Sequence, residues 1–246
     1  MCVDGKCNAG RAFPPFGASP VGFLAETMLL RHNGEAMQIL AVSDQVVDRI
    51  YELVPQGHFA DIQMILSCGD LPYAYLEYLV TMLNVPLFYV PGNHDPAHND
   101  RFVLAQAEGC TNLDLKTARC NNLLLAGFGG SIRYRPYGVN QYTQSEAYFR
   151  AIWLLTGLLA NRLRCGRTLD ILLTHSPAFG IHDDDSSAHR GLKAINWLLR
   201  IARPRYHFHG HMHEIRRNIS PDVTRLGPTT SINIFPYEVI EVPIAV

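Results

Sequence analysis

Side chains that bind metal ions or carry protons recur at the ends of short apolar runs in this sequence. The runs ILAVS, MILSCG, LFYVPG, ILLT and YHFHG are each followed at once by such a side chain. The candidates are Asp44, Asp70, Asn93, His94, Asp95, His175, His211 and His213. Carboxylate and amide oxygens suit hard divalent cations, whereas imidazole suits zinc, iron and manganese. The set therefore predicts a site for one or two divalent ions, of manganese, iron or zinc.

A mixed set of oxygen and nitrogen ligands commonly holds two ions, and one carboxylate must then bridge them. Two ions about 3.5 to 4 Å apart clamp the attacking and leaving oxygens of an in-line displacement, and they bring the pKa of bound water toward neutrality. The predicted chemistry is hydrolysis of a small-molecule phosphate ester, with nucleotides among the candidate substrates.

The apolar runs are typical of buried strands, and helical segments separate them in repeated βα winding. Because the carboxyl ends of the strands border the ligand crevice of an α/β sheet, side chains that follow the strands should converge there. We expect strands at 38–43, 62–67, 86–90, 112–118, 122–127, 169–174, 205–209, 222–226, 231–235 and 238–244, and helices at 45–54, 73–83, 99–107, 144–163 and 189–202. The loop at 127–143 is long enough to serve a function, and a polar loop is expected at 180–188.

Length and composition favour one folded domain. A chain of 246 residues with 48% hydrophobic and 17% charged residues is ordinary for a globular protein. Because the strand pattern begins at Met37, we expect the domain at 37–246 and a poorly ordered extension at 1–36. The apolar stretch 20–30 is interrupted by Glu26 and lacks the flanks of a secretory signal. No run approaches the roughly 20 residues of a membrane span, so we expect a cytoplasmic protein with no membrane partner.

Cysteine usage and charge identify no further partner. The 6 cysteines lack the close pairs of a zinc site, and we expect free thiols. A formal net charge of −1 and a pI near 6.8 give no general attraction to nucleic acid. Nucleic acid is therefore not an expected partner, and the oligomeric state is left open.

At the candidate residues the sequence resembles the calcineurin-like metallophosphoesterase family. The family's patterns occur in order as SD ending at 44, CGD at 68–70, GNHD at 92–95, TH at 174–175 and GHMH at 210–213. A single GD is a worthless signal, whereas GNHD followed by TH and GHMH in this order is specific. The resemblance is to a small, single-domain, phosphodiesterase-like member of the family.

The resemblance implies a fold, a four-layer α/β/β/α sandwich of two mixed sheets flanked by helices. It also implies roles for the candidate residues. Asp70 would bridge the ions, with Asn93, His175 and His211 completing one metal site and Asp44 with His213 contributing to the other. His94 would be the acid near the leaving group, with Asp95 as the partner that orients its imidazole. Asn93 and His94 would also contact the substrate.

One position departs from the family pattern. The first motif of the family is Asp-x-His, and here it is Asp44-Gln45-Val46. Valine cannot bind a metal, so the first metal site lacks its imidazole. We expect that site to be weakened or empty, and the site of Asp70, Asn93, His175 and His211 to be the more secure one.

Simpler interpretations exist for five of the candidates when each is taken alone. Asp44 and Asp70 could be helix N-caps, and Asn93 and Asp95 could be turn residues. His175 could be a strand-end histidine bonded to the backbone.

Other polar residues receive weaker assignments. His207 and His209 alternate at strand period with the two histidines that follow, and we assign them to packing or to support of the ligands. Arg133 and Arg135 in the long loop are candidate phosphate contacts. The remaining loop residues are expected to be solvated or at the substrate's edge: His98, His182, Asp183, Asp184, Asp185 and His189.

The sequence thus favours a metal-dependent phosphoesterase, and the expected open cleft favours diesters. The first alternative is a nucleotide- or phosphate-binding regulatory protein that lost the two-metal clamp through Val46. A nuclease is the second alternative, and it would need a basic groove beside the metals.

Overall fold

A computed structural model describes residues 36–96, 106–213 and 222–244. All of them belong to one compact unit, His32–Val246. The extension predicted for 1–36 lies outside the described residues except for Ala36. Most of the helix predicted at 99–107 also lies outside them.

The first sheet is mixed, with strand order β13-β1-β2-β3-β4. Its strands are β1 (Ala36–Val42), β2 (Met64–Ser67), β3 (Leu87–Tyr89), β4 (Thr111–Asn112) and β13 (Tyr237–Pro243). The first four run parallel, and β13 pairs antiparallel with β1. The strands β2 and β3 are buried along their whole length, as parallel strands covered on both faces are.

The second sheet is also mixed, with strand order β11-β12-β10-β9-β6-β5. Its strands are β5 (Thr117–Cys120), β6 (Leu123–Phe128), β9 (Ile171–Thr174), β10 (Tyr206–His209), β11 (Val223–Leu226) and β12 (Thr229–Asn233). The four central strands are parallel, and the two edge strands are antiparallel to their neighbours. A separate short pair, β7 (Ser131–Ile132) and β8 (Gln141–Tyr142), lies within the long loop.

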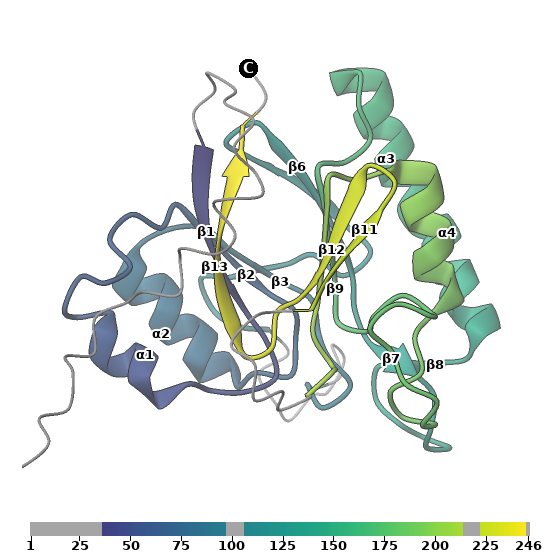
Figure 1. Ribbon diagram of the computed structural model, residues 1–246, viewed down its shortest axis with the longest axis horizontal. Coiled ribbons are helices and arrows are strands. Elements are labelled where there is room, and N and C mark those ends of the chain that lie inside the picture. The colour runs from purple at the N-terminus through teal and green to yellow at the C-terminus, as the bar shows by residue number, and fades with distance from the viewer. Residues whose placement is uncertain (1–35, 97–105, 214–221, 245–246) are drawn as a thin grey trace, which may run out of the picture. The chain divides into compact units, whose positions relative to one another are not determined.

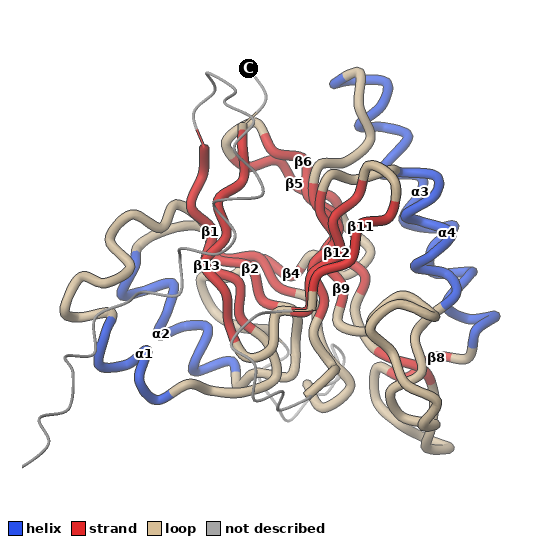
Figure 2. The backbone as a smooth tube through the Cα atoms, viewed as in Figure 1, coloured by secondary structure: helices blue, strands red, loops and turns tan. Residues whose placement is uncertain are grey.

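Helices cover the outer faces of both sheets. α1 (Asp48–Leu53) and α2 (Tyr73–Leu83) lie on the first sheet, and α3 (Gln144–Cys165) and α4 (Lys193–Ala202) lie on the second (Figures 1 and 2). The fold is the expected α/β/β/α sandwich. Three apolar clusters correspond to its three internal boundaries: one between the sheets, one under α3 and α4, and one under α1 and α2.

The longest helix, α3, has sequence signals at both ends. Thr143 accepts a hydrogen bond from the backbone N–H of Glu146, whose side chain accepts one from the backbone N–H of Thr143. This reciprocal capping box satisfies two of the N–H groups that a helix start leaves free. At the other end Gly166 has φ 74°, a left-handed conformation that glycine adopts without a steric cost.

One predicted strand, 112–118, is wrong as a single element. It divides into β4 and β5, which pair with β3 of the first sheet and β6 of the second. Between them Leu115 has φ 56°, and this left-handed residue interrupts the extended backbone. The chain therefore crosses from one sheet to the other inside a segment whose apolar pattern is continuous.

Two predicted helices begin later than expected. The helix predicted at 189–202 starts at Lys193, because Leu192 forms a parallel bridge with Ala178 and is extended. The helix predicted at 45–54 is confined to α1, which starts after the backbone turn at Asp44, where φ is 64°. Within the described part of the chain, no helix is long and apolar enough to cross a membrane.

Candidate metal centre

The candidate ligands follow the carboxyl ends of strands from both sheets. Asp44 and Asp70 come after the parallel strands β1 and β2, and His175 and His211 come after β9 and β10. Three of these residues have left-handed backbone: Asp44 with φ 64°, Asp70 with φ 55° and His211 with φ 66°. Such strain costs free energy in non-glycine residues and clusters at functional sites. The sheets thus bring together side chains from distant parts of the sequence.

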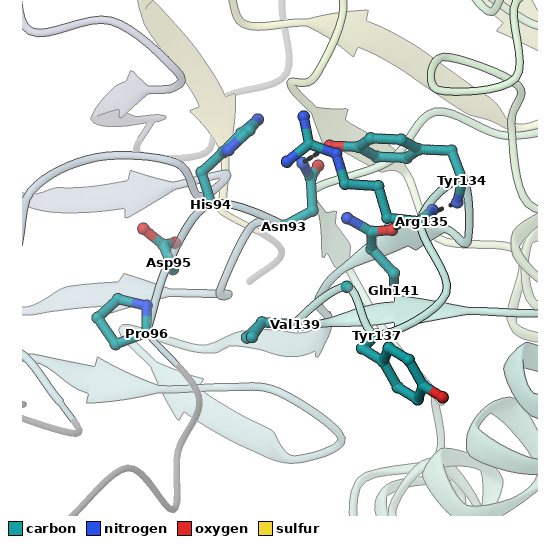
Figure 3. Close-up of a pocket in the computed structure, with 10 residues that line it drawn as sticks. Asn93, His94, Asp95, Pro96, Tyr134, Arg135, Tyr137, Val139 and Gln141 are labelled. Atoms are coloured by element: carbon teal, nitrogen blue, oxygen red, sulfur yellow. Dashed lines mark hydrogen bonds between the residues drawn. The ribbon is translucent and has the colours of Figure 1, made fainter.

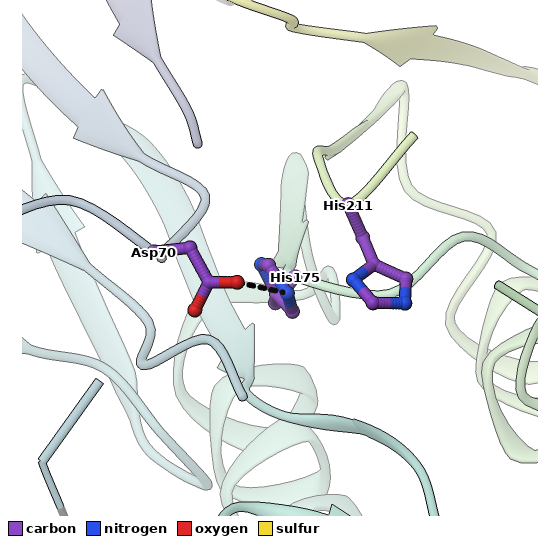
Figure 4. Close-up of side chains that lie close together, drawn as sticks. All are labelled: Asp70, His175 and His211. Atoms are coloured by element: carbon purple, nitrogen blue, oxygen red, sulfur yellow. Dashed lines mark ion pairs between the residues drawn. The ribbon is translucent and has the colours of Figure 1, made fainter. Parts of the chain in front are cut away.

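Asp70, His175 and His211 form the tightest cluster, drawn in Figure 4. One ligand atom from each lies within 4.8 Å of the others, a spacing that can accommodate a metal ion. His175 is buried and His211 is nearly so, with 4% of its surface exposed. Side chains this deeply buried need partners, because burial of unpaired polar groups is costly.

The ring of His175 is oriented toward the cluster by the backbone. Its Nδ1 lies 2.8 Å from the carbonyl oxygen of Cys68, so Nδ1 carries the proton and donates it. Its Nε2 faces the Oδ1 of Asn93 at 3.0 Å and the Oδ2 of Asp70 at 3.3 Å. Burial lowers the pKa of His175, but the negative charge of Asp70 outweighs this and raises it to about 9. Without metal, the proton on Nε2 of His175 therefore occupies the position at which a metal cation would bind.

The two oxygens of Asp70 have different surroundings. Oδ1 accepts a hydrogen bond of 2.8 Å from the backbone N–H of His94. Oδ2 is buried and pairs with the charged Nε2 of His175 at 3.3 Å, without a well-formed hydrogen bond from any of the described residues. Burial raises the pKa of this carboxyl, but the neighbouring His175 holds it well below its usual range. An ionised, buried oxygen that is neutralised only by the displaceable proton of His175 fits a divalent cation, and the donor set around it has the chemistry of a metal site.

His211 is held in the tautomer that a ligand requires. Its Nε2 lies 2.7 Å from the carbonyl oxygen of Ala188 and donates to it, which leaves Nδ1 as the unprotonated nitrogen. Burial and the positive charge of His175 lower the pKa of His211 to about 3. The ring is therefore neutral at physiological pH, as a metal ligand must be.

Asn93 points its amide oxygen into the cluster and its amide nitrogen out of it. Oδ1 faces His175, while Nδ2 donates a hydrogen bond of 3.2 Å to the hydroxyl of Tyr134. The hydroxyl thereby fixes which end of the amide faces the cluster. Tyr134 lies in the long loop, 41 residues away along the chain.

Asp44 and His213 form a second, adjacent pair. Oδ1 of Asp44 lies 3.0 Å from Nε2 of His213, and Oδ2 accepts hydrogen bonds from the hydroxyl of Ser43 and the backbone N–H of His211. The hydrogen bond to Asp44 raises the pKa of His213. These side chains are close to the cluster, but they are paired with each other.

The position that lacks the expected imidazole contributes no ligand. Val46 packs against the apolar cluster under α1 and α2, and Gln45 is exposed. The structure therefore brings together the ligands of one site more completely than those of the other.

Close approach of backbone segments brings the ligands together. A Cβ atom at Gly92 would overlap the carboxylate of Asp70, and one at Gly210 would overlap Ser43 and Asp44. Any larger residue at these two positions would push the motif loops apart. The glycines of GNHD and GHMH thus have a packing role.

The assignment of Asp95 as the partner of His94 differs from what the structure shows. The Oδ2 of Asp95 accepts hydrogen bonds from the backbone N–H groups of Gly92 at 2.7 Å and Asp70 at 3.0 Å. The imidazole of His94 projects away from this carboxylate in Figure 3. Burial raises the pKa of Asp95 to about 6. Asp95 therefore joins two ligand loops, and the ring of His94 is exposed at their surface.

A cleft of about 600 Å³ adjoins the metal cluster on the side of His94 (Figure 3). We call it the Arg135 cleft, and its lining residues are Asn93, His94, Asp95, Pro96, Tyr134, Arg135, Tyr137, Gly138, Val139 and Gln141. The guanidinium of Arg135 lies 5.3 Å from the centre of the Tyr134 ring. Arg133 instead forms an ion pair with Glu146 and donates to the backbone of Gln141. Of the two candidate phosphate contacts, only Arg135 faces the cleft.

His207 and His209 are buried beside the site. The ring nitrogens of His207 bond to the hydroxyls of Thr174 and Ser231, and those of His209 bond to the carbonyl of Gly210 and to His182. Burial lowers the pKa of both rings. They are neutral, hydrogen-bonded core residues beside the ligand loop, which agrees with the packing role assigned to them.

The remaining loop candidates vary in position. The ring of His189 lies 5.2 Å from that of His211, whereas Asp183 and Asp184 accept hydrogen bonds from backbone N–H groups of their own loop. Asp185 is exposed. His98 lies outside the described residues.

The simpler N-cap interpretation of the aspartates is wrong. The N-caps of α1 and α2 are Val47 and Pro72, and neither helix has a side-chain cap. Asp44 and Asp70 are therefore free to act at the site.

Comparison with known proteins agrees with this geometry. A family model described as calcineurin-like phosphoesterase matches residues 37–214, most of the chain and all of the candidate ligands. The chain belongs to the calcineurin-like phosphoesterase family. Among its relatives is the uncharacterized protein MJ1162 of Methanocaldococcus jannaschii, which is 26% identical over 191 residues, 72% of this chain and 78% of that protein.

One solved structure has a similar fold, and a second has a weaker likeness. One crystal structure matches with a TM-score of 0.60 at 14% identity, covering 86% of this chain and all of the other. A single mutant of Vps29 from Entamoeba histolytica matches with a TM-score of 0.39 at 13% identity, covering 80% of this chain and 73% of that one. At 14% identity the first likeness shows the fold alone.

Sequence reasoning missed the residues that orient the ligands of this calcineurin-like centre. Tyr134 and Ala188 belong to none of the motifs, and although Cys68 opens the CGD motif, the role of its backbone oxygen has no sequence signature. Only the position of Tyr134 in an unusually long loop could have identified it.

Proposed function

We propose that this protein is a metal-dependent phosphoesterase that hydrolyses a small phosphodiester or phosphomonoester. The observation that carries the proposal is the buried Oδ2 of Asp70, which lies beside two histidines, forms an ion pair of 3.3 Å with His175 and has no well-formed hydrogen bond from the described residues. Purely structural carboxylates of this depth are normally hydrogen-bonded. The family of the chain supports the same chemistry.

Asp70, Asn93, His175 and His211 are the proposed ligands. A bound divalent ion supplies polarisation of a phosphoryl oxygen and lowers the pKa of a water molecule toward neutrality. Oxygen and imidazole donors together suit manganese, iron or zinc. We propose one tightly held ion there, and a weaker site at Asp44 and His213, because Val46 provides no donor.

His94 and Arg135 would act on the substrate. His94 lies at the rim of the Arg135 cleft, where an imidazole can donate a proton to the departing oxygen. The guanidinium of Arg135 can form paired hydrogen bonds with phosphate oxygens. The cleft is open and holds more than a bare phosphate, so we propose diesters, including nucleotides, as the preferred substrates.

The first experiment is hydrolysis of a chromogenic phosphodiester with and without manganese. Asp70→Asn should lower the rate by at least about 100-fold, because the neutral amide cannot replace a ligating carboxylate. Asp61→Asn is the matched control, since Asp61 is exposed and precedes the same strand, β2, at its other end.

Equal rates in Asp70→Asn and the wild type, or turnover indifferent to chelator, would overturn the proposal. Manganese-stimulated turnover that only Asp70→Asn loses would support it.

A second candidate function is nucleotide or phosphate binding without turnover. The observation that favours it is Val46, which packs in the apolar cluster and leaves the Asp44 and His213 pair short of a donor. Calorimetric binding of a nucleotide in the presence of manganese, with no hydrolysis of it over hours, would establish the binder and exclude the enzyme.

A cytoplasmic location belongs to the same proposal. Its support is the free state of the cysteines in the described part of the chain, Cys68, Cys110, Cys120 and Cys165. Free thiols are the rule in reducing compartments.

A further inference from the structure

The helix α3 has a second apolar face, which points away from the protein core. Its inner face, buried on the second sheet, consists of Ala147, Ala151, Leu154 and Leu158. A surface helix normally carries polar residues opposite such a face. The residues found there are Phe149 (73% exposed), Ile152 (53%), Trp153 (65%), Leu159 (60%) and Leu163 (80%). We call these five residues the outer face of α3.

The outer face is too large to be incidental. Isolated exposed apolar residues are normal on monomers, but contiguous apolar patches mark interaction sites. Phe149 and Trp153 are one helical turn apart, and the five side chains extend over about 20 Å of helix. Large aromatic side chains of this kind anchor protein interfaces.

The outer face is nearly symmetric about Thr156. Phe149 precedes Thr156 by seven residues and Leu163 follows it by seven. If two copies of α3 pack antiparallel about a twofold axis at Thr156, Phe149 meets Leu163 of the other copy. Successive residues are about 100° apart around the helix, so Ile152 and Leu159 lie on the same side of the outer face. In the antiparallel pair, Ile152 of one copy therefore lies beside Leu159 of the other. The small side chains of Thr156 and Ala160 allow the two helices to approach closely at the centre. Trp153 of one copy then lies over Ala160 of the other.

Charges at the helix ends agree with this arrangement. Glu146 and Arg164 lie on the same edge of the outer face, because they are 18 residues apart, five full turns at 3.6 residues per turn. In the antiparallel pair each Glu146 comes beside the Arg164 of the other copy. Arg164 is exposed, and the side chain of Glu146 is 45% exposed. Between 151 and 161 the helix has no charged residue that would oppose contact.

We propose that the outer face of α3 is the interface of a homodimer in which the two helices pack antiparallel about a twofold axis at Thr156. An isologous interface must be self-complementary. The pattern of apolar and charged residues along α3 is self-complementary in this way. A membrane is a poorer occupant, because helices that lie on membranes carry lysine and arginine on the face opposite the apolar one. In α3 that face is the buried inner face.

Oligomeric state is the first test. Light scattering after size-exclusion chromatography should give a dimer for the wild type and a monomer for Trp153→Glu, with unchanged circular dichroism. Met82→Glu is the matched control, since Met82 is an exposed apolar residue (46%) of another helix, and it should remain dimeric. The proposal would be overturned if the wild type were a monomer, even one that binds anionic vesicles. It would also be overturned if Trp153→Glu remained a dimer.

Cross-linking tests the axis itself and does not depend on the stability of Trp153→Glu. A short bis-maleimide should join Thr156→Cys chains into dimers beyond the level of the wild type, whose own cysteines set the background. Ser145→Cys is the control, because Ser145 is exposed on the same side of α3 but would lie about 33 Å from its copy. Equal cross-linking of the two variants would overturn the antiparallel arrangement.

Discussion

At the scale of single residues, backbone carbonyl groups determine which ring nitrogen of each ligand histidine is protonated. Cys68 accepts the Nδ1 proton of His175, and Ala188 accepts the Nε2 proton of His211. The two rings therefore present different nitrogens to the same point. Such partners fix the tautomer and the ring orientation of metal-binding histidines. Their effect comes from the backbone and does not depend on the chemistry of the side chain at 68 or 188.

Tyr134→Phe should weaken metal binding while leaving the fold intact. Without the hydroxyl, Nδ2 of Asn93 loses its acceptor and the amide is no longer held with Oδ1 toward His175. Loss of such a supporting hydrogen bond costs about 10- to 100-fold in metal affinity. Manganese titration by calorimetry measures it, with Tyr137→Phe as the control because Tyr137 is 99% exposed.

An effect of Tyr134→Phe on KM for a substrate, with unchanged manganese affinity, would show that Tyr134 contacts substrate and does not position Asn93.

Manganese binding should release about one proton per ion near pH 7.5. His175 has a pKa of about 9 without metal, because the charge of Asp70 outweighs burial, so it carries a proton that the ion must displace. The affinity should then rise by up to about tenfold per pH unit and level off near pH 9. Calorimetry in buffers of different ionisation enthalpy counts the protons.

Binding enthalpies that do not depend on the buffer would mean that His175 is neutral before the metal binds, contrary to its pairing with Asp70.

The candidate ligands could be predicted from the sequence, but the groups that hydrogen-bond to them and orient them could not. Asp70, His175 and His211 follow recognisable apolar runs, and their order along the chain is specific. The hydrogen-bond partners of Asp95 were not predictable, because a sequence motif does not show whether a carboxylate faces a neighbouring ring or the backbone N–H groups of another loop.

At the scale of elements, the ligands follow the ends of β-strands, and loop residues orient their side chains. Nine of the ten predicted strands match observed ones within two residues, and most of the nine are parallel strands in the sheet interior, which have continuous apolar patterns. The exception is 112–118, where the apolar pattern does not show that the chain passes from β4 to β5. Partner strands are chosen by tertiary packing, which a local pattern cannot record.

A half-buried acid in β13, Glu238, gives a pH-dependent stability. Burial raises the pKa of Glu238 from 4.5 to about 7. The folded state therefore binds more protons than the unfolded state between these values, so stability is lost as the pH rises from 4.5 through 7. Glu238→Gln should raise the free energy of unfolding by about 1 to 3 kcal/mol at pH 8 and by almost nothing at pH 4.

Urea unfolding at the two pH values measures this difference. Glu241→Gln, at an exposed position of the same strand, should show no such pH dependence. A uniform gain for Glu238→Gln at both pH values would instead indicate a packing effect.

At the scale of the whole molecule, the metal centre exists because two sheets face each other. Asp70 and Asn93 come from the first sheet, and His175 and His211 come from the second. An apolar cluster joins the sheets and includes residues of β1, β2, β9 and β10. The sequence predicted the layers through the family resemblance, whereas the pairing order of the strands needed the structure. The stability of the interior and the geometry of the centre therefore depend on the same packing.

The most direct test of this account is anomalous diffraction from crystals soaked in manganese, recorded at the manganese absorption edge. We predict a strong peak within bonding distance of Asp70 Oδ2, Asn93 Oδ1, His175 Nε2 and His211 Nδ1, with a weaker peak or none beside Asp44 and His213. Ordered side chains at these four residues without a peak between them would contradict it.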